Sequence, residues 1–359
     1  VFTSTPRGDA VAGLEYRYDI RTADSEENAR RIEVVGSLPA WLSFVDNGDG
    51  TGSLAGTPSG TDGGIYTFQL RVVETDTPEE LSSIQNVVIA VDAVLRERRD
   101  FSPEYHMNLV IPNERSVLQF RVKDLYFDRT DTSGIRDAFE VALLGEDGRS
   151  LVFTYADGKD SFINFTEGLE VVQAPGVTYD ATTGIVSLNL VGVPAETVGK
   201  LIFRLVNNDT DEESYVEISD IQIVNAAEDA SAPVRGFSLE AERSVASPSW
   251  VEFGQLGDIT GSVRADYQRT SFTERGKVLH AQFQLENIGT YGVNGPVVVA
   301  VKNISDASVS LRNADGVTPE GFAYIDVTKY LVNGRLDPNG RTAIAELVFN
   351  NPNEVQFSY

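Results

Sequence analysis

Residues 38–44 read LPAWLSF, residues 47–52 read NGDGTG and residues 54–58 read LAGTP. Together these three runs predict a β-hairpin. Trp41 begins an apolar strand, and the Asn, Asp and Gly residues that follow suit a plain tight turn. The leucine of the last run opens the return strand, which ends at Gly-Thr-Pro because proline cannot donate a ladder hydrogen bond. We expect Trp41 to be a core residue rather than a sugar platform, since leucines flank it.

Strand patterns recur along the whole chain. Apolar and polar residues alternate at period two in residues 14–20, 66–73 and 116–122. The one helix-like window, residues 24–31, is short and polar, so we expect a loop or a single turn there. Apolar residues make up 41% of the chain, which is enough for packed cores. The sequence therefore predicts an all-β fold built from tandem β-sandwiches.

Length and local composition predict three units. A chain of 359 residues has room for two or three ordinary domains. Residues 94–100 are a charged run and residues 226–234 a run of small residues, and both read as linkers. They divide the chain into units at residues 1–93, 100–226 and 235–359.

The middle unit shows about eight strand patterns with no helix between them. Residues 139–144 read as a mostly buried strand, and residues 145–148 supply a turn. Residues 151–155 would then return as the antiparallel partner of that strand. This layout favours a jelly roll.

The charge balance restricts the possible partners. The chain has 54 acidic and 29 basic residues, a formal charge of −25 and a pI near 4.4. A field of this sign repels nucleic acid and anionic lipid and attracts divalent cations. No run approaches the roughly 18 apolar residues of a membrane span, so we expect no membrane insertion.

Cysteine is absent, which excludes a disulfide framework, a thiolate metal site and a cysteine nucleophile. Zero cysteines together with high acidity favour an exported bacterial protein. Val1 begins the chain without a signal peptide, so we expect a segment of a longer secreted or cell-surface protein.

Several motifs of residues 1–93 fall in an order found in one domain family: FTSTP at 2–6, LPAWL at 38–42, LAGTP at 54–58 and GIY at 64–66. In this respect the first unit resembles the immunoglobulin-like, dystroglycan-type cadherin-like domains of bacterial surface proteins. The resemblance implies a seven-strand sandwich used as a spacer or an adhesive unit.

The later units carry weaker likenesses. Residues 118–224 are similar in layout to calcium-bearing jelly rolls such as carbohydrate-binding modules, whose final strand resembles VEISD at 216–220. In the third unit, LEN at 285–287, PVVVAV at 296–301 and LDPNG at 336–340 resemble bacterial Ig-like domains. These likenesses imply a jelly-roll-like domain at 100–226 and an Ig-like domain at 235–359.

The sequence motifs that would indicate a catalytic site are weak. The two histidines, His106 and His280, lie in a segment beside the first linker and in a strand, and no Gly-x-Ser-x-Gly motif occurs. Two tryptophans are few for a glycosidase cleft, which also needs a carboxyl in an apolar pocket. We therefore expect that the protein is not an enzyme.

Two acidic loops predict a calcium site. One places Asp128, Asp131 and Asp137 between two strands, and the other joins two further strands with Asp209 and Asp211. Calcium takes six to eight oxygen ligands, which clustered Asp side chains and backbone carbonyls supply. If both loops lie at the same end of the sandwich, their oxygens converge. The alternative is that these are solvated turn residues, which Asp and Asn suit without any ion.

These patterns lead to one expected function and two alternatives. We expect a non-catalytic structural or adhesive segment, stabilised by Ca²⁺, with neighbouring domains of the parent chain and a glycan or cell-surface protein as partners. The first alternative is a carbohydrate-binding accessory region of a secreted polysaccharide-degrading enzyme, with the middle unit as binder. The second is a subunit of a surface lattice or fibre.

Overall fold

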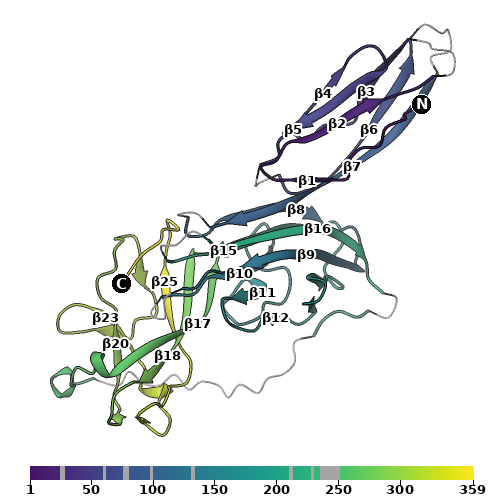
Figure 1. The fold of residues 1–359 in the computed structure, drawn as a ribbon. Coiled ribbons are helices and arrows are strands. Elements are labelled where there is room, and N and C mark those ends of the chain that lie inside the picture. Colours follow the sequence, from purple (N-terminus) through teal and green to yellow (C-terminus); the bar gives the residue numbers. More distant parts are fainter. Residues whose placement is uncertain are drawn as a thin grey trace.

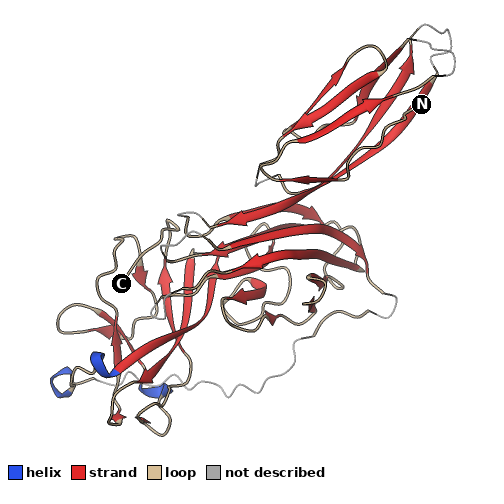
Figure 2. Cartoon of the chain, viewed as in Figure 1, coloured by secondary structure: helices blue, strands red, loops and turns tan. Residues whose placement is uncertain are grey.

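The computed structural model describes residues 1–24, 29–59, 62–75, 81–97, 100–130, 134–209, 213–227, 230–234 and 251–359. Throughout these ranges the protein is built from β-sheets that are antiparallel apart from one short parallel pairing in the N-terminal unit, with three single-turn 3₁₀ helices and no α-helix (Figure 2). The all-β fold of several sandwiches predicted from the sequence is confirmed. Within the described ranges, no helix has the length and apolar character needed to cross a membrane.

The N-terminal unit is a sandwich of seven strands that projects from the rest of the molecule (Figure 1). Trp41 lies between its sheets and makes edge-on contacts with Tyr16 and Tyr66, at centroid distances of 6.0 and 5.8 Å. One sheet contains β1 (Asp9–Val11), β3 (Arg30–Val35), β6 (Gly64–Glu74) and β7 (Ser82–Arg96); the other contains β2 (Tyr16–Arg21), β4 (Leu42–Asp46) and β5 (Thr51–Gly56).

The predicted hairpin is β4 and β5. Its turn is closed by the Asn47 amide, which donates to the Thr51 carbonyl at 3.0 Å. At the far end of β5, a Cβ on Gly56 would lie 1.9 Å from the carbonyl oxygen of Trp41, so only glycine fits. The prediction of a hairpin beside a tryptophan core is confirmed.

Strand β7 belongs to two units at once. It pairs with β6 and β1 in the N-terminal sheet, and its last residues pair with β16 (Tyr215–Asn225) of the middle unit. Residues 94–96 are therefore strand, and the interpretation of residues 94–100 as a linker is wrong for this part. The strand continues through these residues because the inward positions of β7 stay apolar as far as Leu95, which is buried.

The middle unit packs five strands of an eight-stranded sheet against a five-stranded sheet, around the largest apolar cluster of the described residues. Strands β9, β16 and β7 form the centre and one side of the first sheet, which is thereby continuous with the N-terminal unit (Figure 1). The first sheet runs β13 (Val177–Asp180), β14 (Ile185–Asn189), β9 (Ser116–Tyr126), β16 and β7; the second runs β12 (Val172–Gln173), β11 (Ser161–Thr166), β10 (Ala138–Leu144), β15 (Val198–Val206) and β8 (Glu104–Val110).

One predicted strand of this unit is wrong. Residues 151–155 do not form a strand, although Ser150 makes a single bridge with Leu144. The partners of β10 are β11 and β15 instead. Strand β11 shows no alternation of apolar and polar residues, because it is buried on both faces. A bulge in its pairing with β10 places Ser161 on the same face as Asn164 and Thr166.

The C-terminal unit consists of small antiparallel sheets around a second apolar cluster. That cluster also contains Phe101, Ile135, Ala138 and Val206 of the middle unit, so the two units share one core. The sheets are β17 (Val263–Thr273), β18 (Val278–Asn287), β25 (Ala345–Asn350) and β21 (Ser310–Leu311); β19 (Val293–Asn294) and β24 (Arg335–Leu336); and β20 (Val298–Ala300), β23 (Ala323–Asp326) and β22 (Gly316–Val317).

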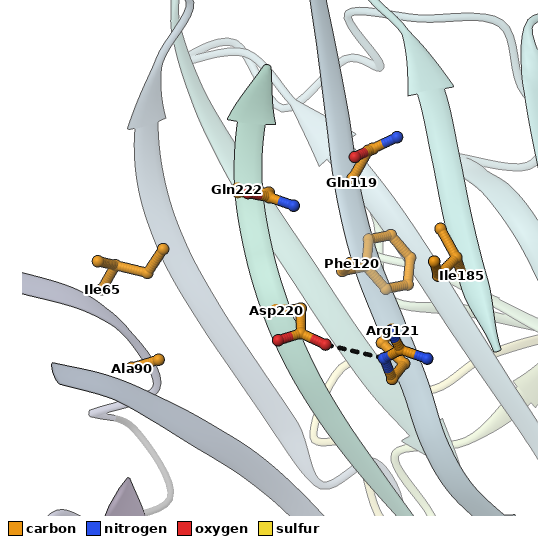
Figure 3. Close-up of a pocket in the computed structure, with 8 residues that line it drawn as sticks. All are labelled: Ile65, Ala90, Gln119, Phe120, Arg121, Ile185, Asp220 and Gln222. Atoms are coloured by element: carbon orange, nitrogen blue, oxygen red, sulfur yellow. Dashed lines mark hydrogen bonds and ion pairs between the residues drawn. The ribbon is translucent and has the colours of Figure 1, made fainter. Parts of the chain in front are cut away.

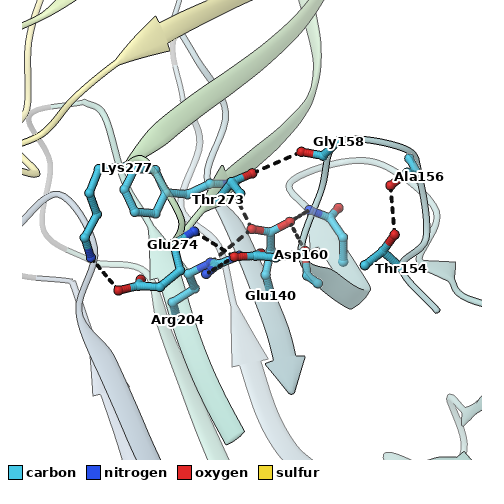
Figure 4. Close-up of polar contacts among 12 residues, drawn as sticks. Glu140, Thr154, Ala156, Gly158, Asp160, Arg204, Thr273, Glu274 and Lys277 are labelled. Atoms are coloured by element: carbon cyan, nitrogen blue, oxygen red, sulfur yellow. Dashed lines mark hydrogen bonds and ion pairs between the residues drawn. The ribbon is translucent and has the colours of Figure 1, made fainter. Parts of the chain in front are cut away.

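A buried ionic network lies between the middle and C-terminal units (Figure 4). Arg204 of β15 and Glu140 of β10 are both 0% exposed. The Arg204 guanidinium donates to Glu140 Oε2 at 3.3 Å and also pairs with Asp160. Such a pair is stable only when every remaining oxygen and proton finds a partner.

The C-terminal unit supplies those partners. The backbone amides of Phe272 and Glu274 donate to Glu140 at 2.9 Å and to Asp160 at 2.7 Å. The Asn164 side chain donates to both Glu140 and the Thr270 carbonyl, at 2.9 and 2.7 Å. Polar groups on the outer face of the second sheet thus hydrogen-bond to β17 and to the residue that follows it.

Removal of the Arg204 side chain should destabilise the protein strongly. Arg204→Ala leaves Glu140 and Asp160 as buried charges without their main partner, and the expected loss is about 3–5 kcal/mol of unfolding free energy. Urea unfolding followed by circular dichroism measures it. The control Arg17→Ala removes an exposed pair with Asp19 and should leave the midpoint almost unchanged. Equal midpoints for the two variants would contradict a buried network.

Candidate metal centre

Three carboxylates from distant parts of the sequence meet in the middle unit. Glu97 directly follows β7, Asp137 directly precedes β10, and Asp209 lies three residues after β15. One oxygen of each lies within 4.8 Å of the others, which is a grouping that could hold a metal ion. The position follows from topology, because neighbouring strands of both sheets end here.

Asp128 joins the group through Ser214, the residue before β16. The Ser214 hydroxyl lies 2.9 Å from Asp128 Oδ1 and 2.6 Å from Asp137 Oδ2, and its amide donates to Glu97 Oε2 at 2.9 Å. A hydroxyl has a single proton, so it donates to only one of the two aspartates. The second contact requires a proton on a carboxyl group or a cation that attracts the oxygens.

Two oxygens of the group have no hydrogen-bond donor among the residues that the structure describes. They are Glu97 Oε1 and Asp137 Oδ1, on side chains that are 2% and 0% exposed. Unsatisfied buried oxygens are rare in folded proteins, and a bound ion or water is a usual explanation. Oxygen atoms alone make up the donor set, which fits a hard cation such as calcium or magnesium.

Burial and mutual repulsion make these carboxyls hard to ionise on their own. Loss of solvation, reinforced by the charges of neighbouring acids, raises the pKa of Asp137 to about 9 despite the Ser214 hydrogen bond. Loss of solvation likewise raises the pKa of Glu97 to about 7, against the lowering effect of the Ser214 amide. A divalent cation would reverse both shifts by favouring the ionised forms.

The structure brings together three of the five aspartates proposed from the sequence: Asp128, Asp137 and Asp209. Asp131 and Asp211 lie outside the described residues. The two predicted loops are neighbours, since the Thr130 hydroxyl donates to Asp209 Oδ2 at 3.2 Å. Their convergence is what the calcium prediction required, and metal binding itself stays a prediction.

Glu97 falls in the predicted linker and is not among the acids predicted as ligands. A signal for it exists, however. Every second residue from Val87 to Leu95 is buried and apolar, and Glu97 occupies the next inward position of the same alternation. An acid at an inward strand position indicates a buried charge that needs a partner.

The histidines lie elsewhere. His106 is exposed on β8, and His280 of β18 lies 3.4 Å from Glu346 of β25. Glu346 also pairs with Lys159 of the middle unit at 2.7 Å. His280 is therefore part of the contact between the middle and C-terminal units and is not part of the acidic group.

A separate cavity of about 360 Å³ lies where the N-terminal unit meets the outer face of the middle sheet (Figure 3). Asp220, at a bulge in β16 with φ of 54°, pairs with Arg121 of β9 at 2.8 Å. Bulges and positive φ at a non-glycine residue are features of functional sites. The side chains around this pair are Gln119, Gln222, Ile65 and Ile185.

Comparison with known families identifies the first unit. A family model described as "Putative Ig domain" matches residues 1–91. The N-terminal unit is a domain of this family. The resemblance stated for residues 1–93 is confirmed at this level, while the jelly-roll and Ig-like assignments of the later units stay predictions.

No curated protein matches the sequence. Among solved structures, the chain is similar to the endo-fucoidan hydrolase MfFcnA4 of glycoside hydrolase family 107, with a TM-score of 0.24 and 19% identity over 38% of this chain and 25% of that one. A variant of that enzyme matches with the same TM-score and identity over 63% of this chain and 27% of the other. MfFcnA9, from the same family, matches with a TM-score of 0.19 and 15% identity over 62% of this chain and 32% of that enzyme.

The chain thus spans between a quarter and a third of the length of these enzymes. At such TM-scores the likeness decides neither the fold nor the function of this protein.

The metal-free protein should lose stability as the pH rises. Between about pH 4 and 9 the folded state keeps a proton on Asp137 that the unfolded chain has released, so the unfolding free energy falls by up to about 1.4 kcal/mol per pH unit. Urea unfolding in EDTA from pH 5 to 9 measures the slope. Asp137→Asn should reduce it, since the amide does not titrate.

Saturating calcium should also reduce the slope, because a bound cation favours the ionised carboxyl. The prediction is wrong if the slope in EDTA is the same for Asp137→Asn as for the unaltered protein.

Proposed function

We propose that the chain is a non-catalytic structural or adhesive segment of a large secreted or cell-surface bacterial protein, stabilised by calcium at Glu97, Asp128, Asp137 and Asp209. The observation that carries this proposal is that Glu97 and Asp137 each have a buried oxygen with no donor among the described residues, in a group where one oxygen each of Glu97, Asp137 and Asp209 lie within 4.8 Å of one another. Glu97, Asp128 and Asp137 are buried and Asp209 is half-buried, and a cation bound among them would compensate the charge of their ionised forms.

Calcium is the cation that suits these ligands best. The ligands are carboxylates from loops and a strand end, with the Ser214 hydroxyl beside them, and no histidine or cysteine takes part. Calcium accepts six to eight oxygens in irregular geometry, whereas magnesium requires a near-ideal octahedron and zinc prefers nitrogen and sulfur. The charge of −25 also favours cation uptake.

The joints between the units support a mechanical role. Strand β7 runs from the N-terminal sandwich into the middle one, and the Tyr105 hydroxyl donates to the carbonyl of Gly63 across the same boundary. A continuous strand transmits force along its hydrogen-bonded ladder, and a buried polar interface resists hinge motion. Both properties suit a spacer that holds neighbouring parts at a set distance.

A second candidate function is binding of a glycan at the cavity beside Arg121. Amide groups from Gln119 and Gln222 flank a charge-neutral Arg–Asp pair, and Ile65 and Ile185 add apolar surface. Planar polar groups beside a small apolar patch suit a ring with hydroxyls on its rim and an apolar face. This arrangement favours the carbohydrate-binding alternative derived from the sequence.

Calcium should raise the melting temperature of the EDTA-treated protein. At a calcium concentration 100 times the dissociation constant, mass action adds about 2.7 kcal/mol, which corresponds to a rise of roughly 4 °C for a chain of 359 residues that unfolds as one unit. Differential scanning calorimetry measures it. Asp137→Asn should lose most of the rise, whereas Asp19→Asn, the same change at an exposed strand position, should keep it. No rise at millimolar calcium would end the proposal.

A glycan array of neutral and acidic oligosaccharides tests the second candidate. Any glycan bound by the full chain should bind more weakly to the Gln222→Ala variant, by about tenfold for one lost pair of hydrogen bonds. The matched control is Gln69→Ala, whose side chain contacts Asn86 in the N-terminal unit. Absence of binding to every glycan would remove the candidate and leave the structural role untouched.

A further inference from the structure

The acidic group lies beside the contacts that hold the C-terminal unit. Asp209 is preceded by Asn208, whose side-chain amide donates to the Phe357 carbonyl at 3.0 Å and whose Oδ1 accepts from the Phe357 amide at 3.0 Å. This pair of hydrogen bonds holds the backbone at Phe357 against the loop that carries Asp209.

Asp137 also lies next to residues that contact the C-terminal unit. Its neighbour Arg136 contacts Asp266 of β17 at 3.5 Å and donates to the Glu167 carbonyl at 3.0 Å. Ala138, on the other side of Asp137, is fully buried in the core shared with the C-terminal unit.

Glu97 is linked to that core through the segment that follows it. Phe101 packs edge-on against Phe272 of β17, with the ring centroids 5.2 Å apart. The Phe101 carbonyl also accepts from the amide of Asn207 at 2.8 Å, which ties this segment to the Asp209 loop. Each of the three carboxylates is therefore within four residues of a direct contact with the C-terminal unit.

We infer that occupancy of this cation site controls how firmly the C-terminal unit is held on the middle unit. The inference rests on the proposed function and deepens it. Without a cation, no bound ion draws these oxygens together, and the loops that carry Asn208, Arg136 and Phe101 are held less firmly. With calcium bound, the oxygens are drawn together and those contact residues are held in the geometry that fits β17 and Phe357. Cation binding then stabilises an interface whose contact residues are not themselves ligands of the cation.

Linkage makes this coupling reciprocal. If calcium strengthens the docking, then a change that weakens the docking must weaken calcium binding by the same factor. Couplings of this kind are commonly 5-fold to 150-fold in affinity. Calcium affinity can thus be lowered by a variant that touches no ligand.

The first measurement is hydrogen exchange of the full chain in EDTA and in calcium chloride. Chelation should speed exchange of the Phe357 amide, held by Asn208, by about tenfold or more. The Val348 amide, held in the same way by Asn313 within the C-terminal unit, should not change. Exchange at Phe357 that is insensitive to calcium overturns the inference.

The second measurement is calorimetric titration with calcium chloride. Asn208→Ala and Arg269→Ala should each bind calcium about fivefold more weakly or worse. Arg269 tests the coupling from the far side, since it contacts Asn164 at 2.7 Å and the Glu170 carbonyl at 2.9 Å. Asn313→Ala removes a matching two-bond contact inside the C-terminal unit and should bind like the unaltered protein. If Asn208→Ala does not fold, Arg269→Ala alone decides the reciprocity.

The outcomes separate the two proposals. Calcium binding with equal affinity in all variants overturns the coupling and leaves the calcium-stabilised segment intact. Absence of calcium binding to the unaltered chain overturns both.

Discussion

A charge taken out of water needs a partner, and this constraint governs the arrangement of the whole molecule. The middle unit buries Glu140 and Arg204 completely, and it buries Glu97 and Asp137 almost as deeply. At the first pair the chain supplies what is missing, with the arginine itself and the backbone amides of Phe272 and Glu274. At the acidic group the donors recorded among the described residues are neutral: the hydroxyls of Ser214 and Thr130 and the amides of Glu213 and Ser214, which do not offset the charge of ionised carboxylates.

The need for partners also explains why the three units are joined in fixed positions and are not independent domains on flexible linkers. A sheet with a polar outer face can stand in water, but the second sheet of the middle unit carries Asn164, Glu140 and Arg204 under the C-terminal unit. Those groups are satisfied only when β17 lies on them. On the other side, the ladder of β7 passes from one sandwich to the next without a break. Both boundaries are made by hydrogen bonds that require a fixed geometry.

Several elements could be read from single stretches because their cause is local. The turn between β4 and β5 needs Asn and Gly, and β2 shows a strict alternation of buried and exposed residues. Strand β11 could not be read in this way, since its polar residues face another unit and not solvent. Residues 151–155 show the opposite case: their apolar side chains predict a strand, but they pack on the core from a loop.

The sequence by itself determined the all-β class, the N-terminal sandwich and the two acidic loops, because period-two alternation, turn residues and carboxylate clusters are properties of short segments. Only the tertiary structure decided that Glu97 joins Asp128, Asp137 and Asp209, and that β7 and β17 fasten the units together. These features depend on which distant segments meet. A local pattern can mark a position as inward, as it does for Glu97, but it does not identify the distant residues that meet there.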